Sequence, residues 1–385
     1  MRHVANHKFE RCPRCKAKLR PTETWTSNES EFWLECSNPD CNTYVNTYVP
    51  QPYQAAFHKD PHHIKANFGG YGSGKTTTSR MELEKTILIT PAGTTLIGAN
   101  VSSQYEQTIK REFEADFPKA FYSAYSTQKS YADFANGHRV MYRPFDDPDK
   151  LRSYNLSAWF ILEASEVKEE AYTQLKTRLR NTAATVPEYD EDGNVVYERI
   201  EGVDVPKIAY DWRTGIIESN PSAGWIKNSV LNYSDEIHTY GEVRDTYYQN
   251  PDEKDPNIST HITATSANAY LPKDFIQMQV KNHAKWWVDR YIYGSFRYSD
   301  GLVYPSASQY FIEPYPIPRH WKRIVAFDYG LADAACFYLQ RSMRKRTCWC
   351  FTKKYTSLIG RWKSWLSCIL RQQRTFPSAE WYARQ

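Results

Sequence analysis

A glycine-rich segment in the first quarter of the chain has residue types and spacing that could bind phosphate. It reads Gly69-Gly-Tyr-Gly-Ser-Gly-Lys-Thr76 and fits the pattern G-x-x-x-x-G-K-T. Glycines allow backbone N–H groups to converge on phosphate oxygens, and a helix expected over Thr77–Ile87 would add the positive end of its dipole. The pattern therefore predicts a site for a nucleoside triphosphate with Mg²⁺. A chance match is the alternative.

Two side chains of this segment would contact the triphosphate directly. Lys75 would contact the β- and γ-phosphates, and the Thr76 hydroxyl would bind Mg²⁺. A strand expected at His63–Phe68 supports the prediction, because the motif requires a strand before the loop and a helix after it. The predicted phosphate-binding residues are Gly69, Gly70, Gly72, Ser73, Gly74, Lys75 and Thr76.

A triphosphate site of this kind also needs a carboxylate at the end of a neighbouring strand. The apolar run Ala158–Leu162 predicts a buried strand, and Glu163 follows it directly. Leu162 stands where a first acid could have held the metal, so Mg²⁺ would be held through Thr76 and water. Glu163 would activate the attacking water or contact the metal, and Glu166 could add a second charge. Alternatively, Glu163 is a helix-start residue that interacts with the helix dipole.

Four cysteines near the N-terminus have the spacing of a zinc site, C-x2-C-x20-C-x4-C. A segment of this size cannot fold on a few apolar side chains alone, so a metal would stabilise it. Two disulfides or unused thiols are the alternative. A zinc ribbon can bind DNA or protein, and the sequence does not distinguish these partners. The predicted zinc ligands are Cys12, Cys15, Cys36 and Cys41.

Charge and composition favour a globular protein without a membrane segment. The last 45 residues hold 11 Lys and Arg against one acid, whereas the preceding 340 hold 38 basic and 43 acidic residues. The net charge of +5 therefore comes from the tail and is no argument that the whole chain binds DNA. No apolar run approaches the ~20 residues of a membrane helix. The N-terminus lacks a signal-peptide pattern, so we expect reduced cysteines.

Strands alternating with helices predict an α/β fold with a mostly parallel sheet. We expect a zinc ribbon over residues 1–48, a nucleotide-binding domain over 49–265, a linker over 266–320 and a further sheet over 321–385. The acidic stretch Val186–Val205 predicts a surface hairpin or loop. The expected strands of the nucleotide-binding domain are His63–Phe68, Thr94–Val101, His138–Arg143, Ala158–Leu162, Thr214–Ser219 and Ser259–Thr265.

The order of these motifs resembles the large terminase subunit of tailed bacteriophages. Gln54 lies fifteen residues ahead of the loop, where that family has its adenine-reading glutamine, although a surface residue is the alternative. Ser219-Asn220-Pro221 resembles the family's coupling motif, which senses the γ-phosphate, unless it is a simple turn. The family often has arginine where this chain has Tyr71, so the charge-stabilising arginine is unassigned. Arg80 and Arg152 are candidates.

The resemblance implies a DNA-packaging motor. Its P-loop ATPase would use ATP and Mg²⁺ to move double-stranded DNA into a procapsid, as a homo-oligomeric ring on the portal protein. A small terminase subunit would mark the start site. A ribonuclease-H-like nuclease with Mg²⁺ or Mn²⁺ would cut the DNA. Such a motor acts in the cytoplasm of the infected host and is not part of the mature virion.

The resemblance breaks in the expected nuclease. Asp328 ends an apolar strand at Arg323–Phe327 and matches the first nuclease carboxylate, but the only later acids are Asp333 and Glu380. Two-metal cleavage needs several converging carboxylates, so we expect an incomplete nuclease. After about Gln340 the sequence turns rich in Trp, Cys and Arg without clear periodicity. A frameshifted or foreign tail is the favoured interpretation, and a basic DNA-binding extension is the alternative.

Two other functions fit parts of the pattern. A helicase or repair ATPase with a zinc ribbon would share the glycine-rich loop and the cysteines, but the strand ending at Asp328 argues against it. A non-catalytic DNA-binding remnant would use the zinc module and the basic tail without turning over nucleotide.

Overall fold

The computed structural model describes residues 11–25, 32–126, 128–245 and 254–297 with their side chains. It describes the backbone alone of four strands at 322–328, 335–342, 349–357 and 380–383. The chain divides into two compact units, Met1–Pro305 and Ser306–Gln385, and each is described by itself. In the described residues, every helix is too short or too polar to cross a bilayer.

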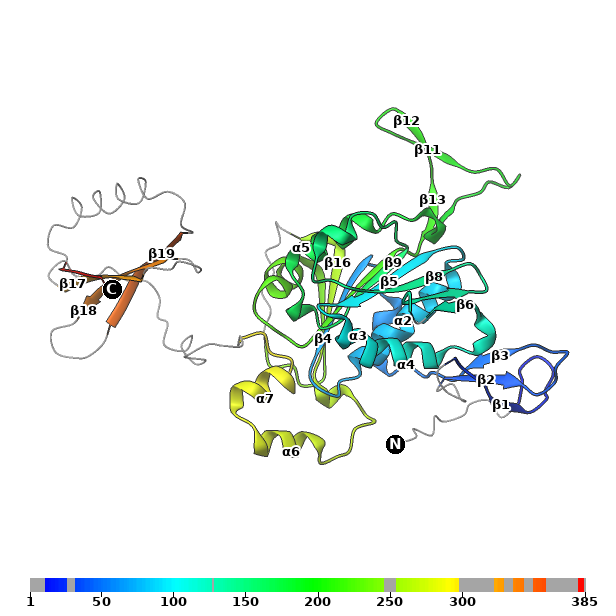
Figure 1. Cartoon of the computed structure of the whole chain (residues 1–385), viewed down its shortest axis with the longest axis horizontal. Helices are drawn as coiled ribbons and strands as arrows, with labels where there is room; N and C mark the ends of the chain where they lie inside the picture. The colour runs from blue at the N-terminus through cyan, green and yellow to red at the C-terminus, as the bar shows by residue number, and fades with distance from the viewer. Residues whose placement is uncertain are drawn as a thin grey trace. The chain divides into compact units, whose positions relative to one another are not determined.

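A large sheet forms the centre of the first unit (Figure 1). Its first seven strands run parallel, and two antiparallel strands complete it at one edge. The predicted α/β fold with a mostly parallel sheet is therefore confirmed. In spatial order the strands are β15 (Ser234–Tyr240), β16 (Asp255–Thr263), β4 (Ile64–Gly69), β14 (Thr214–Ser219), β9 (Ala158–Ile161), β5 (Thr94–Ala99), β8 (Arg139–Pro144), β7 (Tyr131–Phe134) and β6 (Tyr122–Ser126).

Apolar side chains cover both faces of this sheet, as a parallel sheet requires. Successive residues of β9 alternate between two buried clusters: Trp159 and Ile161 pack in one, and Phe160 packs in the other. Helix α2 packs against the second cluster through Leu83 and Ile87. The helices are α1 (Pro52–Lys59), α2 (Lys75–Ile89), α3 (Ser102–Gln107), α4 (Ile109–Asp116), α5 (Glu169–Arg178), α6 (Phe275–Asn282) and α7 (Lys285–Tyr291).

Three strands of this sheet were not predicted. The edge strand β15 contains charged and polar residues, so its sequence lacks the apolar run of a central strand. The hairpin β6–β7 carries tyrosines and serines in place of aliphatic residues. The predicted strand Ser259–Thr265 runs instead from Asp255 to Thr263.

The acidic stretch predicted as a surface hairpin or loop forms two short hairpins that project from the body of the unit (Figure 1). The inner one pairs the start of the stretch with Ile208–Asp211, beyond its end, and the outer one contains Tyr197 and Val203, which are exposed. The four strands are β10 (Thr185–Pro187), β11 (Tyr197–Ile200), β12 (Val203–Pro206) and β13 (Ile208–Asp211).

A small antiparallel sheet carries the cysteine pattern. Aromatic rings join it to the edge of the large sheet: Trp33 and Tyr44 each contact Phe121, with ring centroids 5.2 and 5.1 Å apart. Trp25 stacks on Tyr125 at 5.8 Å. The small module is thus packed against the nucleotide-binding fold. Its strands are β1 (Leu19–Pro21), β2 (Trp33–Cys36) and β3 (Tyr44–Asn46).

The second unit contains a sheet in the order β19-β18-β17-β20. Asp328 is the last residue of β17 and pairs with Cys336 of β18. The side chain of Asp328 and the part of the predicted linker after residue 297 lie outside the described residues. Two of these strands fall in the segment without clear sequence periodicity. The strands are β17 (Lys322–Asp328), β18 (Ala335–Ser342), β19 (Trp349–Ser357) and β20 (Glu380–Ala383).

A buried histidine makes the stability of the first unit dependent on pH. His138 is fully buried, with Nδ1 2.8 Å from the Thr90 carbonyl oxygen and Nε2 2.9 Å from the Thr95 hydroxyl. Burial lowers the pKa of His138 to about 4, although the Thr90 carbonyl opposes the shift. An unfolded histidine has a pKa of about 6.5, so between these values the unfolded chain binds a proton that the native chain does not.

We therefore expect the free energy of unfolding to fall as the pH drops from about 6.5 to about 4. His138→Gln removes this contribution. In that window, the free energy of unfolding of the variant should change less steeply with pH than that of the parent protein, by up to about 1.4 kcal/mol per pH unit. Urea denaturation at pH 7, 6 and 5 measures both slopes. Equal slopes for the two proteins would contradict the assignment.

Candidate nucleotide-binding site

The glycine-rich loop joins the end of β4 to the start of α2, in the middle of the parallel sheet. All six residues of β4 are buried, so the loop starts from a rigid support. Gly72 and Gly74 have φ angles of 69° and 82°, in the region that favours glycine. A Cβ atom on Gly74 would lie 2.5 Å from the Tyr53 hydroxyl oxygen. The glycines are therefore required by backbone geometry and by close packing.

Four carbonyl oxygens of the loop accept hydrogen bonds from side chains outside it. By contrast, in the described part of the chain the N–H groups of Gly74, Lys75 and Thr76 donate to no backbone carbonyl. A loop with bound carbonyls and free amides at a helix N-terminus favours an anion. The bonds run from Asn220 Nδ2 to Gly69 O (2.7 Å), Thr265 Oγ1 to Tyr71 O (2.8 Å), Asn268 Nδ2 to Gly72 O (2.7 Å) and Tyr53 Oη to Ser73 O (2.7 Å).

Helix α7 contacts the loop at Tyr71. The ring of Tyr71 stacks on Tyr291 with centroids 4.8 Å apart and planes at 2°, and its N–H donates to the Tyr291 carbonyl at 2.7 Å. The ammonium of Lys75 lies 6.0 Å from the Tyr71 ring centroid. Trp287 contacts the same ring at 5.8 Å. The predicted linker segment is thus part of the loop's surroundings.

Gln54 lies beside the loop, on α1. It is buried, and its Oε1 accepts the Gln51 N–H at 2.9 Å, which closes the first turn of the helix. Gln51 in turn donates to Asn268 Oδ1 at 2.9 Å and accepts from the Ala269 N–H at 2.9 Å. The glutamine therefore has a helix-capping role that the sequence pattern did not predict. Its contact with adenine stays a prediction.

Glu163 follows β9 in a left-handed backbone conformation with a φ of 49°. Side chains other than glycine rarely adopt this conformation, and it is concentrated at functional sites. Burial raises the pKa of Glu163, the charge of Lys75 opposes this, and Glu166 adds to it. Glu166 accepts a hydrogen bond from Gln104 on α3. The residue is thus a partly buried carboxylate within electrostatic reach of the loop lysine.

A second carboxylate at the site was missed by sequence reasoning. Glu218 on β14 is 1% exposed, and its Oε1 accepts a hydrogen bond from the Thr76 hydroxyl at 2.6 Å. Burial raises the pKa of Glu218 to about 7, while the charge of Lys75 and the Thr76 hydroxyl oppose the shift. The sequence did contain an indication of this role. Glu218 is an acid inside a predicted strand whose other residues are apolar or small, two residues before the predicted Asn220.

The two candidates for the charge-stabilising arginine form ion pairs elsewhere. Arg80 is buried on α2, where its guanidinium lies 2.6 Å from Asp116 and 2.8 Å from Glu112. Arg152 is exposed and lies 2.8 Å from Asp149. These pairs do not involve the loop, and the arginine remains unassigned.

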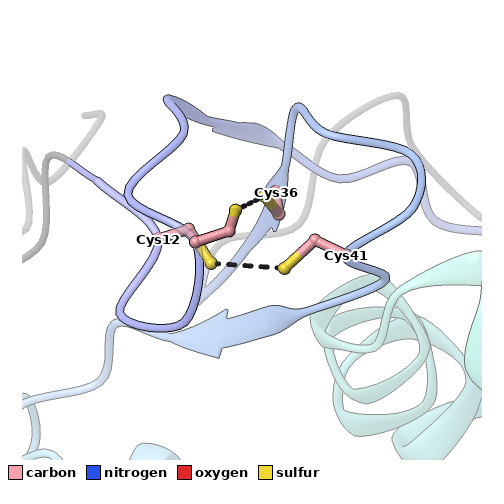
Figure 2. A group of neighbouring side chains, drawn as sticks. Cys12, Cys36 and Cys41 are labelled. Carbon is pink, nitrogen blue, oxygen red and sulfur yellow. Dashed lines mark hydrogen bonds between the residues drawn. The ribbon is translucent and has the colours of Figure 1, made fainter.

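The four predicted zinc ligands lie together in the small module, three of them labelled in Figure 2. Their sulfur atoms all lie within 4.8 Å of one another. Cys12 and Cys41 sulfurs are 3.8 Å apart, and those of Cys15 and Cys36 are 3.3 Å apart. A disulfide needs about 2.05 Å, whereas a tetrahedron with Zn–S bonds of about 2.3 Å has edges near 3.8 Å. The arrangement thus fits a tetrahedral metal better than two disulfides.

Part of this chain is similar to proteins of a known family. Residues 61–190, which include the loop and Glu163, match the family model described as phage terminase large subunit. About a third of this chain is therefore similar to the phage terminase large subunit family. A terminase relative is the PBSX phage terminase large subunit of Bacillus subtilis (strain 168), 33% identical over 119 residues. That stretch is 29% of this chain and 27% of the relative, so the match spans under a third of its length.

Two solved terminases are also similar. One is the large terminase of a thermophilic bacteriophage in complex with ADP, with a TM-score of 0.44 and 14% identity over 86% of this chain and 77% of that one. The other is the large terminase ATPase domain of Thermus phage P74-26, with a TM-score of 0.44 and 16% identity over 65% of this chain and 94% of that domain.

Gly74 and Gly193 offer a matched test of the loop geometry. Both have a left-handed φ, of 82° and 80°, but a Cβ on Gly193 would meet no described atom within 4 Å. Gly193→Ala should therefore cost only the conformational term of about 1–2 kcal/mol in free energy of unfolding. Gly74→Ala should cost more and should weaken binding of a fluorescent ATP analogue, because it displaces Tyr53. Urea denaturation and a binding titration measure these effects. Equal results for both variants would contradict the close packing.

Proposed function

We propose that this chain acts as a terminase large subunit, which hydrolyses ATP with Mg²⁺ and uses the energy to move double-stranded DNA into a procapsid. The observation that carries the proposal is the loop itself: its carbonyls are bound by four outside side chains, while amides of Gly74, Lys75 and Thr76 are left for phosphate. The charge of Lys75 opposes the raised pKa of Glu163, which supports a shared site for the two residues.

Each residue would have a distinct part in hydrolysis. The loop amides and Lys75 would hold the β- and γ-phosphates and offset their charge. Glu163 would orient the attacking water and accept its proton, because a partly buried carboxylate with a raised pKa is a better base near neutral pH. Asn220, which holds the Gly69 carbonyl, would transmit a shift of the loop to the end of β14. Gln54 would contact the adenine.

The residues at the site suit magnesium. Hydroxyl and carboxylate oxygens are the ligands that Mg²⁺ prefers, and Thr76, Glu163 and Glu218 supply them. When bound, the ion would neutralise charge that develops on the phosphate oxygens. Thr76 would contact it with its hydroxyl oxygen.

We also propose that the four-cysteine module holds Zn²⁺ through Cys12, Cys15, Cys36 and Cys41. The sulfur geometry supports four-coordinate zinc. The module has a core of only a few apolar side chains, such as Leu19 and Val45. Metal binding would therefore contribute much of its stability.

The remaining assignments rest on the family. A homo-oligomeric ring on the portal protein, a small terminase subunit and action in the host cytoplasm are the partners and place that packaging would require. A nuclease using Mg²⁺ or Mn²⁺ would have Asp328 as a carboxylate at the end of β17. Within the printed sequence, Asp333 and Glu380 are the only acids beyond it, so this second activity stays a prediction.

ATP turnover tests the proposed motor. Lys75→Ala should abolish phosphate release, because the γ-phosphate loses its cation. Glu163→Gln should lower kcat by about 10²–10⁴-fold and leave nucleotide binding intact, because only the base is removed. Glu170→Gln, at an exposed acid in the first turn of α5, is the control and should retain most activity. Phosphate release with and without duplex DNA measures all three, and unchanged DNA-stimulated turnover in Lys75→Ala would refute the assignment.

Metal analysis tests the zinc module. The purified chain should contain one zinc per molecule, and Cys12→Ser should lose it, because three thiolates bind zinc less tightly than four. We expect the variant to unfold locally, with greater protease sensitivity before Thr47. Cys368→Ser, outside the four-cysteine pattern, is the control. Full zinc content in Cys12→Ser by elemental analysis would exclude the proposed ligand set.

A further inference from the structure

The residue between the end of strand β9 and Glu163 is Leu162, so no acid stands at that position. Leu162 is buried and packs with Phe160 and Leu83, so it offers nothing to a metal ion. If β9 provided the only acids of the site, a single carboxylate would have to act on both water and metal.

The neighbouring strand places an acid at the same level. Strands β9 and β14 run parallel, and Ile161 pairs with Ile217. Leu162 follows this pair directly after the end of β9, and Glu218 follows it within β14, so both lie at the carboxyl end of the sheet. Because side chains alternate along a strand, Glu218 points to the same face as Ile216, which packs with Leu162 in one cluster. Both side chains thus face α2.

The contacts of Glu218 point to the metal side of the triphosphate. Its Oε1 accepts a hydrogen bond from the Thr76 hydroxyl, with the two oxygen atoms 2.6 Å apart. On the other side of β14, Asn67 of β4 pairs with Glu218 and donates to the Lys75 carbonyl at 2.9 Å. Glu218 is therefore held under the first turn of α2, next to the threonine that would bind magnesium.

The chemistry of a threonine hydroxyl explains what this contact does. A hydroxyl has one proton and two lone pairs. When the hydroxyl donates its hydrogen bond to a carboxylate, both lone pairs stay free for a cation, and the hydroxyl oxygen becomes more negative. A carboxylate that orients a metal ligand in this way typically changes metal affinity by about 10–100-fold. A carboxylate buried to 1% exposure would be costly unless it served such a role or a stable ion pair.

We propose that Glu218 supplies, from β14, the metal-side carboxylate that β9 lacks at Leu162. It acts as a positioning residue through Thr76, and Glu163 is left to act on water. The metal-side carboxylate, Glu218, and the water-activating carboxylate, Glu163, thus come from β14 and from the residues that follow the adjacent strand β9. The inference rests on the proposed ATP-hydrolysing function.

Magnesium-dependent nucleotide binding tests this assignment without relying on turnover. The affinity for a fluorescent ADP or ATP analogue is measured in EDTA and in Mg²⁺, and Mn²⁺ binding is followed by electron paramagnetic resonance in the presence of ADP. In EDTA, Glu218→Gln should bind nucleotide with the affinity of the parent protein. In Mg²⁺, the increase in its nucleotide affinity, the metal-dependent gain, should be smaller than that of the parent protein by about 10-fold or more. Glu218→Asp should restore part of it, because a carboxylate is present again.

Glu114→Gln is the matched control. Glu114 is also buried, is hydrogen-bonded by the Tyr125 hydroxyl at 2.6 Å and lies on α4. It should keep the full metal-dependent gain. A Glu218→Gln protein that is folded by circular dichroism and keeps the full gain would overturn the inference. If the parent protein bound no nucleotide under either condition, the proposed function itself would fail, so the two failures are distinguishable.

Discussion

The loop between β4 and α2 must leave amides free for phosphate while its carbonyls are bound, and the surroundings of the site are arranged around that requirement. A backbone segment cannot bury carbonyls without partners. Here the partners come from α1, from the end of β14 and from the segment after β16. These segments lie far apart in the sequence, so the loop geometry depends on the whole parallel sheet being assembled.

The same requirement explains why the segment after β16 reaches back to the loop. Thr265 and Asn268 hold two loop carbonyls, and α7 follows with the Tyr71–Tyr291 stack. Carbonyl oxygens of Tyr291 and Ile292 lie so close to Gly70 that a Cβ there would be 2.6 and 2.9 Å from them. A change in loop conformation would therefore displace α7. This tight packing, more than any single bond, couples the nucleotide site to the segment that leads towards the second unit.

Local sequence patterns predicted the parts of this site that depend on local geometry. The loop spacing, the strand before it and the four cysteines are short-range patterns, and the structure has β4, the loop and the grouped thiols. Glu218 and the capping role of Gln54 could not be predicted in this way. Glu218 matters only because the parallel pairing of β14 with β9 brings it to the sheet end where Leu162 lies, and that register is a property of the sheet. Strand β15 was missed because an edge strand with charged residues lacks an apolar run.

Electrostatics links these observations at the loop. The buried ammonium of Lys75 acts on two carboxyl groups, Glu163 and Glu218, and burial raises the pKa of both despite its charge. One cation cannot compensate two buried carboxylates in a low-dielectric site. The shortage of positive charge is therefore built into the residues, and it favours a divalent cation at the Thr76 hydroxyl, which Glu218 orients. A phosphate loop that supplied only Lys75 and amides would favour the anion alone. The acid on β14 makes the same site selective for the anion together with its metal.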